Sequence, residues 1–188
     1  MRSFTRAALV AALVLTPTAA LAQLQVGFDV DAIFPDDEPL DEETGYGFAG
    51  RVGLVVPGTP VLDLVPEIQV GYLDFGTPGI DGSSFDLTMV RATAGLRAGI
   101  GTVLRPTAFG HVGWGQTSLS ANGDDIDFFE DRSGIGEESG FTWDLGLALD
   151  LAILPLVTVG VHGAYNGLDL DEESLNWWTA GAHAAVTF

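Results

Sequence analysis

The chain has 188 residues, with 26 Asp and Glu against seven Arg and no Lys, which gives a formal net charge of −19 at pH 7. A field of this sign repels phosphates and argues against a nucleic-acid partner. The absence of Cys excludes disulfides, thiolate metal sites and cysteine nucleophiles. Because 47% of the residues are nevertheless hydrophobic, charge and apolar surface must be segregated.

The N-terminal segment has the features of an export signal. Arg2 and Arg6 precede a short apolar run, which is followed by the small residues Ala20 and Ala22 in the pattern of a signal peptidase site. The apolar run is too short to cross a membrane as a helix. We therefore predict a signal peptide at residues 1–22, whose removal with its two arginines brings the formal charge to −21.

The remaining residues, 23–188, are predicted to form one domain, and they contain eight segments in which apolar and polar side chains alternate. A period of two is the geometry of a β-strand, whose side chains point alternately to its two faces. Each segment approaches or exceeds the roughly 9–11 residues that a tilted strand needs to cross a bilayer. In chain order they are 24–34, 46–56, 61–73, 84–100, 107–118, 141–153, 157–166 and 175–188.

The sixth segment shows the alternation most clearly, because Leu145, Leu147 and Leu149 share one face and Asp144 and Asp150 the other. The fifth segment has the least regular phase. The connections alternate between long and short, as expected for an up-and-down barrel that begins and ends on the periplasmic side. Long connections are predicted at 35–45, 74–83, 119–140 and 167–174, and short ones at 57–60, at 101–106 and around Pro155.

The last segment alternates in the same way and ends on an aromatic residue, Phe188. In this it resembles the closing strand of bacterial outer-membrane β-barrel proteins, and eight strands in residues 23–188 resemble the small barrels of the OmpA and OmpX kind. The resemblance implies an all-β fold, an eight-stranded antiparallel up-and-down transmembrane β-barrel in the outer membrane. It also implies that the barrel-assembly machinery reads Phe188. The eighth strand is expected to pair with the first, because an open edge in hydrocarbon leaves backbone groups unpaired.

Aromatic side chains on the apolar faces favour a membrane barrel over a soluble one. Tyr and Trp gather where lipid headgroups meet hydrocarbon, because the ring prefers an apolar setting and its polar atom prefers water. A soluble barrel would turn its apolar faces inward and carry charged residues outside. We predict a ring of membrane-interface aromatics near the long connections: Phe34, Tyr46, Tyr72, Trp114, Phe141, Trp143, Tyr165 and Trp178.

The polar faces are predicted to line the barrel interior. An eight-stranded barrel is just wide enough to be filled by its own side chains. Because an unpaired charge in a closed interior is costly, we expect arginines there to pair with carboxylates. The predicted lumen network contains Asp29, Arg51, Glu67, Arg91, Arg97, His111, Asp144, Asp150, His162 and His183.

These features favour a structural or surface-interaction role. A network that opens would make a narrow gated ion channel, and small outer-membrane barrels also include lipid-modifying enzymes; a soluble periplasmic binding barrel is a further alternative. No serine, histidine and acid fall into a catalytic pattern, so no catalytic residue and no cofactor are predicted. The three histidines, His111, His162 and His183, lack the sequence spacing of metal ligands and are interpreted as polar filling.

The long connections hold most of the acidic residues. Their simplest interpretation is a solvated surface. Residues 122–127, Asn-Gly-Asp-Asp-Ile-Asp, resemble a calcium loop only weakly, because they lack the spacing of the helix-flanked site. As partners we expect outer-membrane lipid and lipopolysaccharide. The alternative to a purely solvated surface is that the loop carboxylates share divalent cations with lipid phosphates.

Overall fold

The computed structural model describes residues 23–36, 44–59, 62–76, 79–80, 83–122, 138–170 and 174–188. The predicted signal peptide at residues 1–22 lies outside them. Among the described residues, no helix is long and apolar enough to cross a membrane.

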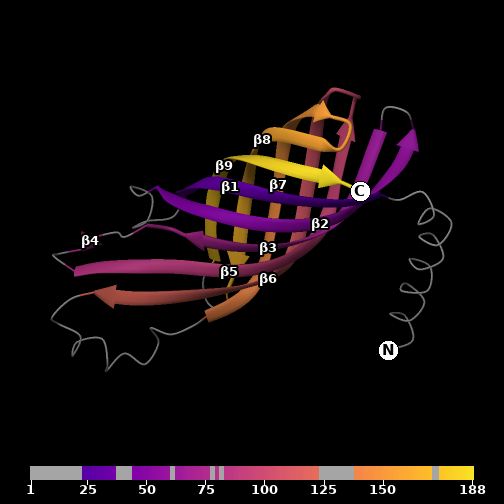
Figure 1. Cartoon of the computed structure of the whole chain (residues 1–188). Coiled ribbons are helices and arrows are strands. Elements are labelled where there is room, and N and C mark those ends of the chain that lie inside the picture. Colours follow the sequence, from indigo (N-terminus) through magenta and orange to yellow (C-terminus); the bar gives the residue numbers. More distant parts are fainter. Residues whose placement is uncertain are drawn as a thin grey trace, which may run out of the picture.

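The described residues form eight long antiparallel strands and one two-residue strand, β4, which pairs only with the start of β5 (Figure 1). Each long strand corresponds to one of the eight segments in which the sequence predicts a period of two. The strands are β1 (Gln23–Pro35), β2 (Gly45–Thr59), β3 (Leu62–Asp74), β4 (Gly79–Ile80), β5 (Ser83–Ile100), β6 (Leu104–Asn122), β7 (Glu138–Leu154), β8 (Val157–Asp169) and β9 (Ser174–Thr187).

The sheet closes into a barrel. Each long strand pairs with its neighbours in the chain, β9 pairs with β1 from Gln25↔Thr187 to Pro35↔Trp177, and β3 pairs with β5. At the seam the Phe188 amide also donates to the Leu24 carbonyl at 2.7 Å. The predicted eight-stranded up-and-down barrel is confirmed. We call the end with the short connections and the C-terminus the turn end, and the end with β4 the loop end (Figure 1).

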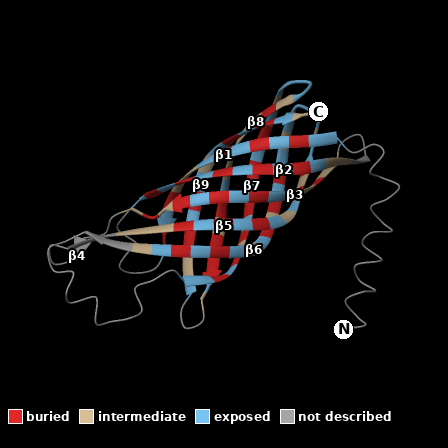
Figure 2. Cartoon of the chain, turned by 60° about the horizontal axis from the view of Figure 1, so that its bottom comes forward, coloured by how far each residue is buried: buried red, intermediate tan, exposed pale blue. Residues whose placement is uncertain are grey.

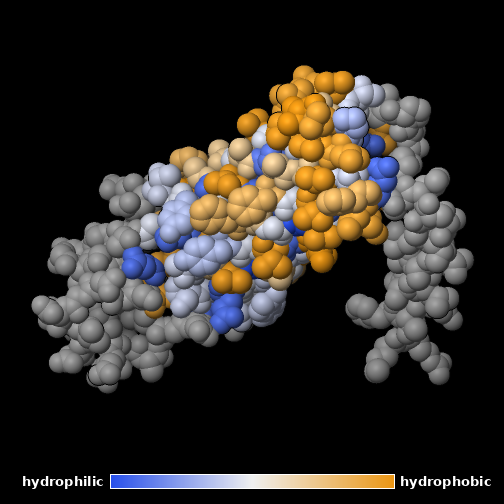
Figure 3. Space-filling view, viewed as in Figure 1, coloured by the Kyte–Doolittle hydropathy of each residue, from blue (hydrophilic) through white to orange (hydrophobic). Residues whose placement is uncertain are grey.

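The apolar faces of the strands point outward. Leu145 and Leu147 are 65% and 70% exposed, whereas Arg51 and Glu67 are each 4% exposed. Buried and exposed residues alternate regularly along β1 and β7, whereas Asn166, Gly167 and Leu168 of β8 are all buried (Figure 2). Hydrophobic side chains gather on the outer surface toward the turn end (Figure 3). A soluble barrel would have the opposite arrangement, so the exterior is suited to lipid.

Several strands extend further toward the loop end than their alternation predicts. β6 continues to Asn122, four residues beyond the predicted segment 107–118, and β7 begins at Glu138 instead of Phe141. The fourth connection, predicted to be long at 167–174, shrinks to residues 170–173. The predicted strand ends are too short here because the alternation of apolar and polar side chains fades in these extensions. The hydrogen-bonded pairing of the backbone does not depend on that alternation and continues.

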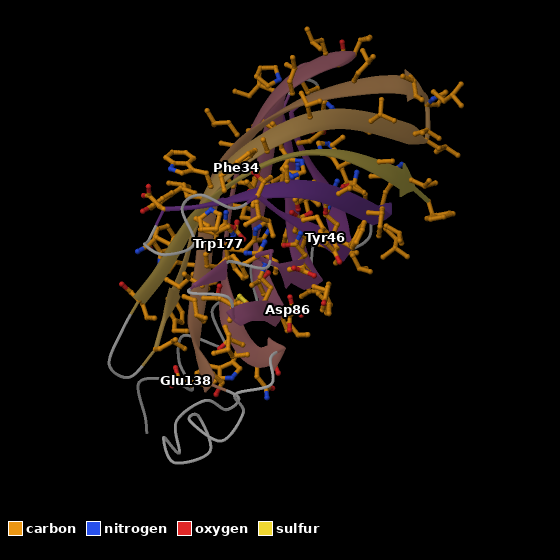
Figure 4. The ribbon with its side chains drawn as sticks, turned by 90° about the vertical axis from the view of Figure 1, so that its left-hand side faces the viewer. Phe34, Tyr46, Asp86, Glu138 and Trp177 are labelled. Carbon is orange, nitrogen blue, oxygen red and sulfur yellow. The ribbon has the colours of Figure 1, made fainter. Side chains whose placement is uncertain are left out.

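The lumen at the loop end is filled by apolar side chains. Phe75 and Trp177 pack edge to face with ring centroids 5.2 Å apart, and Figure 4 shows Trp177 inside the ring of strands. An apolar cluster inside the lumen was not predicted, because the inward faces were expected to be polar. We call this set the apolar cap: Ile33, Leu73, Phe75, Met89, Leu168 and Trp177, all at most 4% exposed.

Candidate functional site: the polar lumen

Below the apolar cap, the structure places the predicted lumen residues inside the barrel. Nine of the ten are at most 7% exposed, and His162 is half-buried. They come from all eight long strands, because each strand contributes every second residue to the interior. Contacts divide them into two groups, one around Glu67 and one around His162 and His183.

Glu67 is the centre of the first group. Its Oε2 accepts from Arg51 Nη1 at 3.2 Å and its Oε1 from Arg97 Nε at 3.3 Å. Arg51 Nε also donates to Asp29 Oδ1 at 3.3 Å. The side chains of Arg51 and Glu67 are at most 3% exposed. One carboxylate thus holds two guanidinium groups in a buried setting, where paired charges are tolerated and single ones are costly.

His111 joins Glu67 to the next charged pair. Its Nε2 lies 2.9 Å from Glu67 Oε1 and its Nδ1 lies 2.7 Å from Asp144 Oδ1. Asp144 in turn forms an ion pair with Arg91 at 3.6 Å, and Arg91 Nη1 donates to Asn166 Oδ1 at 3.0 Å. The first group is therefore one continuous chain of contacts from Asp29 to Asn166.

The second group contains the other two histidines. His162 Nδ1 and His183 Nδ1 face each other at 3.2 Å. On their far sides, His162 Nε2 lies 2.6 Å from Asp31 Oδ1, and His183 Nε2 lies 2.8 Å from Asp150 Oδ1. Thr107 donates its hydroxyl to the second oxygen of Asp150 at 2.9 Å.

Each histidine reaches its carboxylate across a glycine on the intervening strand. Gly95 is paired with both Glu67 and His111. Gly181 stands in the same way between Asp31 and His162. A Cβ at Gly181 would lie 2.9 Å from His162 Nε2 and closer still to Asp31 Oδ1, so a side chain there would block the contact. These glycines are part of the site because they leave the space that the contacts cross.

Gly160 lies in the same way between Asp150 and His183, with which it is paired on its two sides. A Cβ on it would lie 2.6 Å from His183 Nε2.

The polar lumen also contains residues that the predicted network omitted. Gln25 and Gln69 accompany Arg51 and Asp29, and Arg105 pairs with Asp63 at 2.7 Å near the turn end. Asp31 contacts His162 and was also not among the predicted network residues. Their inward positions follow from alternation, but their partners depend on strand register, which a single sequence does not reveal.

Two cavities lined by described residues adjoin the polar lumen. The larger, about 380 Å³, opens at the turn end and is lined by Arg51, Arg97, Arg105, Asp150 and His183, among others. The smaller, about 20 Å³, lies deeper and is bordered by side chains of both contact groups. Ion pairs occupy the middle of the described lumen, between the turn-end cavity and the apolar cap at the loop end.

The predicted interface aromatics lie on the outer surface, on neighbouring strands. Trp178 is paired with Phe34 on one side and with Tyr165 on the other. The rings of Tyr165 and Trp178 pack with centroids 4.8 Å apart. Trp143 and Tyr165 are half-buried against each other, while the other six are exposed: Phe34, Tyr46, Tyr72, Trp114, Phe141 and Trp178. Phe34, Tyr46 and Tyr72 lie within two residues of a strand end. Trp114, Phe141, Trp143 and Tyr165 lie further inside their strands, because β6, β7 and β8 extend toward the loop end.

The predicted cation sites at the loops lie largely outside the described residues, including residues 123–127. Asp86 and Glu138 mark the described rim at the loop end (Figure 4). At the other end, the Phe188 side chain is 70% exposed and contributes little packing.

The fold and its apolar exterior define an outer-membrane-type β-barrel. Among solved structures, the chain is similar to Neisserial surface protein A, with 15% identity and a TM-score of 0.57 over 88% of this chain and 97% of that one. It is also similar to OprG of Pseudomonas aeruginosa, with 11% identity and a TM-score of 0.51 over 89% and 96%. The outer-membrane protease OmpT of Escherichia coli matches at 10% identity over 89% and 96%, with a TM-score of 0.47.

At these identities the first two likenesses establish the fold alone, and the third is too distant to inform on activity. No protein-family profile and no curated protein sequence matches the chain.

Proposed function

We propose that the chain is an exported, non-enzymatic protein of the outer membrane, whose closed barrel presents acidic loops at the cell surface. The observation that carries this proposal is the double closure of the lumen, by the ion-paired polar network and by the apolar cap. Such a barrel serves as a rigid membrane platform, so its variable chemistry lies in the connections at the loop end. The three described histidines contact carboxylates or each other inside the barrel, which supports the absence of a lipid-exposed catalytic set.

Planar-bilayer recording tests the closed lumen. We expect no single-channel conductance from the refolded wild-type barrel, because the apolar cap excludes water and the guanidinium groups are held by carboxylates. Trp177→Ala removes the largest side chain of the apolar cap, and its conductance is compared with that of the wild-type barrel. Discrete wild-type openings that disappear in Glu67→Ala would support the alternative, a gated channel that uses the turn-end cavity.

Surface display is tested on intact cells. An epitope inserted between residues 125 and 135 should be accessible to antibody without permeabilisation, whereas one placed in the connection at Pro155 should require it. The opposite pattern, or recovery of the protein in the soluble periplasmic fraction, would contradict the proposed location and orientation.

Phe188 is proposed to act in assembly and not in stability. Because its side chain is largely exposed, Phe188→Ser should lower the amount of folded protein in outer-membrane fractions several-fold, while the purified variant should refold in detergent with a nearly unchanged unfolding midpoint. Heat-modifiable migration on gels measures both quantities. Equal amounts of folded wild-type and variant protein in cells would reject the role of Phe188 as an insertion signal.

A further inference from the structure

In the second contact group, each histidine ring contacts a carboxylate through one nitrogen and the other histidine through the other nitrogen. The Nε2 atom of each ring contacts a carboxylate oxygen, Asp31 for His162 and Asp150 for His183. An ionised carboxylate only accepts hydrogen bonds, so each Nε2 must carry the proton. A neutral ring has one such proton, and therefore both Nδ1 atoms present lone pairs to each other across 3.2 Å.

Two facing lone pairs in a buried setting repel unless something electron-poor lies between them. Either an additional proton or a metal ion between the two nitrogens removes this repulsion. Two nitrogen ligands on a tetrahedral Zn²⁺, each at about 2.0–2.1 Å, stand about 3.3 Å apart. The observed spacing of 3.2 Å matches that value and lies at the long limit of an ordinary hydrogen bond.

A third ligand is within reach. Asp29 is paired with His183 across the β1–β9 seam, and a carboxylate oxygen of Asp29 lies within 4.8 Å of a nitrogen of each histidine. Asp29 also accepts from Arg51 and Gln69, so it has to move inward from these partners to bind. The small cavity of about 20 Å³ that Asp29 and His162 border has room for one water molecule as a fourth ligand.

The surrounding residues match the outer contacts of known metal sites. A ligating histidine usually donates its other ring N–H to a carboxylate, which fixes the tautomer and makes the ligating nitrogen more basic. Asp31 and Asp150 stand in that position, and Gly181 and Gly160 leave the space through which they reach the rings. The turn-end cavity, which His183 and Asp150 line, provides a route of entry.

The charge of the described lumen also favours a cation. Five carboxylates in its middle are set against three guanidinium groups, while Asp63 and Arg105 pair separately toward the turn end. His111 can carry one positive charge between Glu67 and Asp144, but the second contact group has two carboxylates and no arginine in hydrogen-bond contact with either. The residues of this count are Asp29, Asp31, Glu67, Asp144 and Asp150 against Arg51, Arg91 and Arg97.

We propose that His162, His183 and Asp29 bind one divalent transition-metal ion inside the barrel, with Zn²⁺ as the best match to two imidazoles, a carboxylate and a water. Imidazole ligands favour zinc, copper and nickel over calcium or magnesium. The ion links β1, β8 and β9, and so it fastens the seam where the last strand meets the first.

The test uses the full barrel, refolded in detergent, stripped with a chelator and titrated with Zn²⁺ in a calorimeter. Wild type should bind one ion per chain, whereas His162→Gln and His183→Gln should bind at least 100-fold more weakly. His111→Gln is the matched control, since it removes a buried lumen histidine outside the site and should bind like the wild type. Heat-modifiable migration verifies that each variant is folded.

Cobalt gives a readout that does not depend on variants. Co²⁺ bound to the wild-type barrel should produce the intense visible absorption of a four-coordinate site with nitrogen ligands, and Zn²⁺ should displace it. A spectrum that remains that of the aqueous ion would overturn the proposal and leave the histidine pair sharing a proton. Stoichiometric binding retained in a folded His162→Gln, His183→Gln double variant would also overturn it, by placing the ion at the acidic connections.

Discussion

Glu67→Ala is expected to lower the free energy of unfolding by about 3–5 kcal/mol, the cost typical of leaving buried charges without their partner. Its carboxylate accepts from Arg51 and Arg97 and contacts His111. Removing it takes the carboxylate partner from Arg97 and leaves Arg51 with Asp29 alone, although both guanidinium groups belong to residues that are at most 6% exposed. Unfolding in guanidinium chloride from detergent micelles, followed by heat-modifiable migration, measures the loss.

Asp63→Ala is the matched control for Glu67→Ala. Asp63 also pairs with an arginine, Arg105, but its side chain is 29% exposed at the turn end. Solvent screens such a pair, and the expected loss is within about 1 kcal/mol. Equal losses for the two variants would mean that water reaches Glu67 as freely as Asp63, and the closed lumen would then be wrong.

Leu147→Arg is expected to destabilise the barrel by about 2–4 kcal/mol, the cost of a guanidinium facing lipid near the bilayer midplane. Leu147 lies in the middle of β7 and is 70% exposed on the outer surface. Unfolding should be measured after reconstitution into lipid vesicles, because the penalty depends on the depth of hydrocarbon.

Ile153→Arg provides the comparison on the same strand and the same face. Ile153 lies one residue from the turn end of β7 and is 50% exposed. An arginine there can reach the headgroups, so the expected cost is about 0–1 kcal/mol. If both variants lost the same amount of stability, a transmembrane placement of β7 would be contradicted. A soluble barrel would give that result.

The alternation of side chains determined most of the architecture. A strand has two faces, so Leu147 and Asp144 are assigned to opposite sides without knowledge of any neighbouring strand. Closure of β9 on β1 followed from the cost of an open edge in hydrocarbon. The sequence was less informative about the loop end. There β6 continues to Asn122 through residues in which apolar and polar side chains alternate only weakly.

The partners inside the lumen were decided by the tertiary structure. Asp31 and His162 are 131 residues apart and meet only because Gly181 is in register with both. The same holds for Glu67 and His111 across Gly95. A shift of one residue in either pairing would place these side chains on opposite faces of the sheet.

The sequence by itself therefore determined how many long strands there are and which of their faces is apolar or polar, because a period of two is local information carried by each strand. The tertiary structure alone decided which charges pair, where the apolar cap lies and that His162 and His183 face each other. These depend on strand register around a closed barrel, and register is set by all eight long strands together.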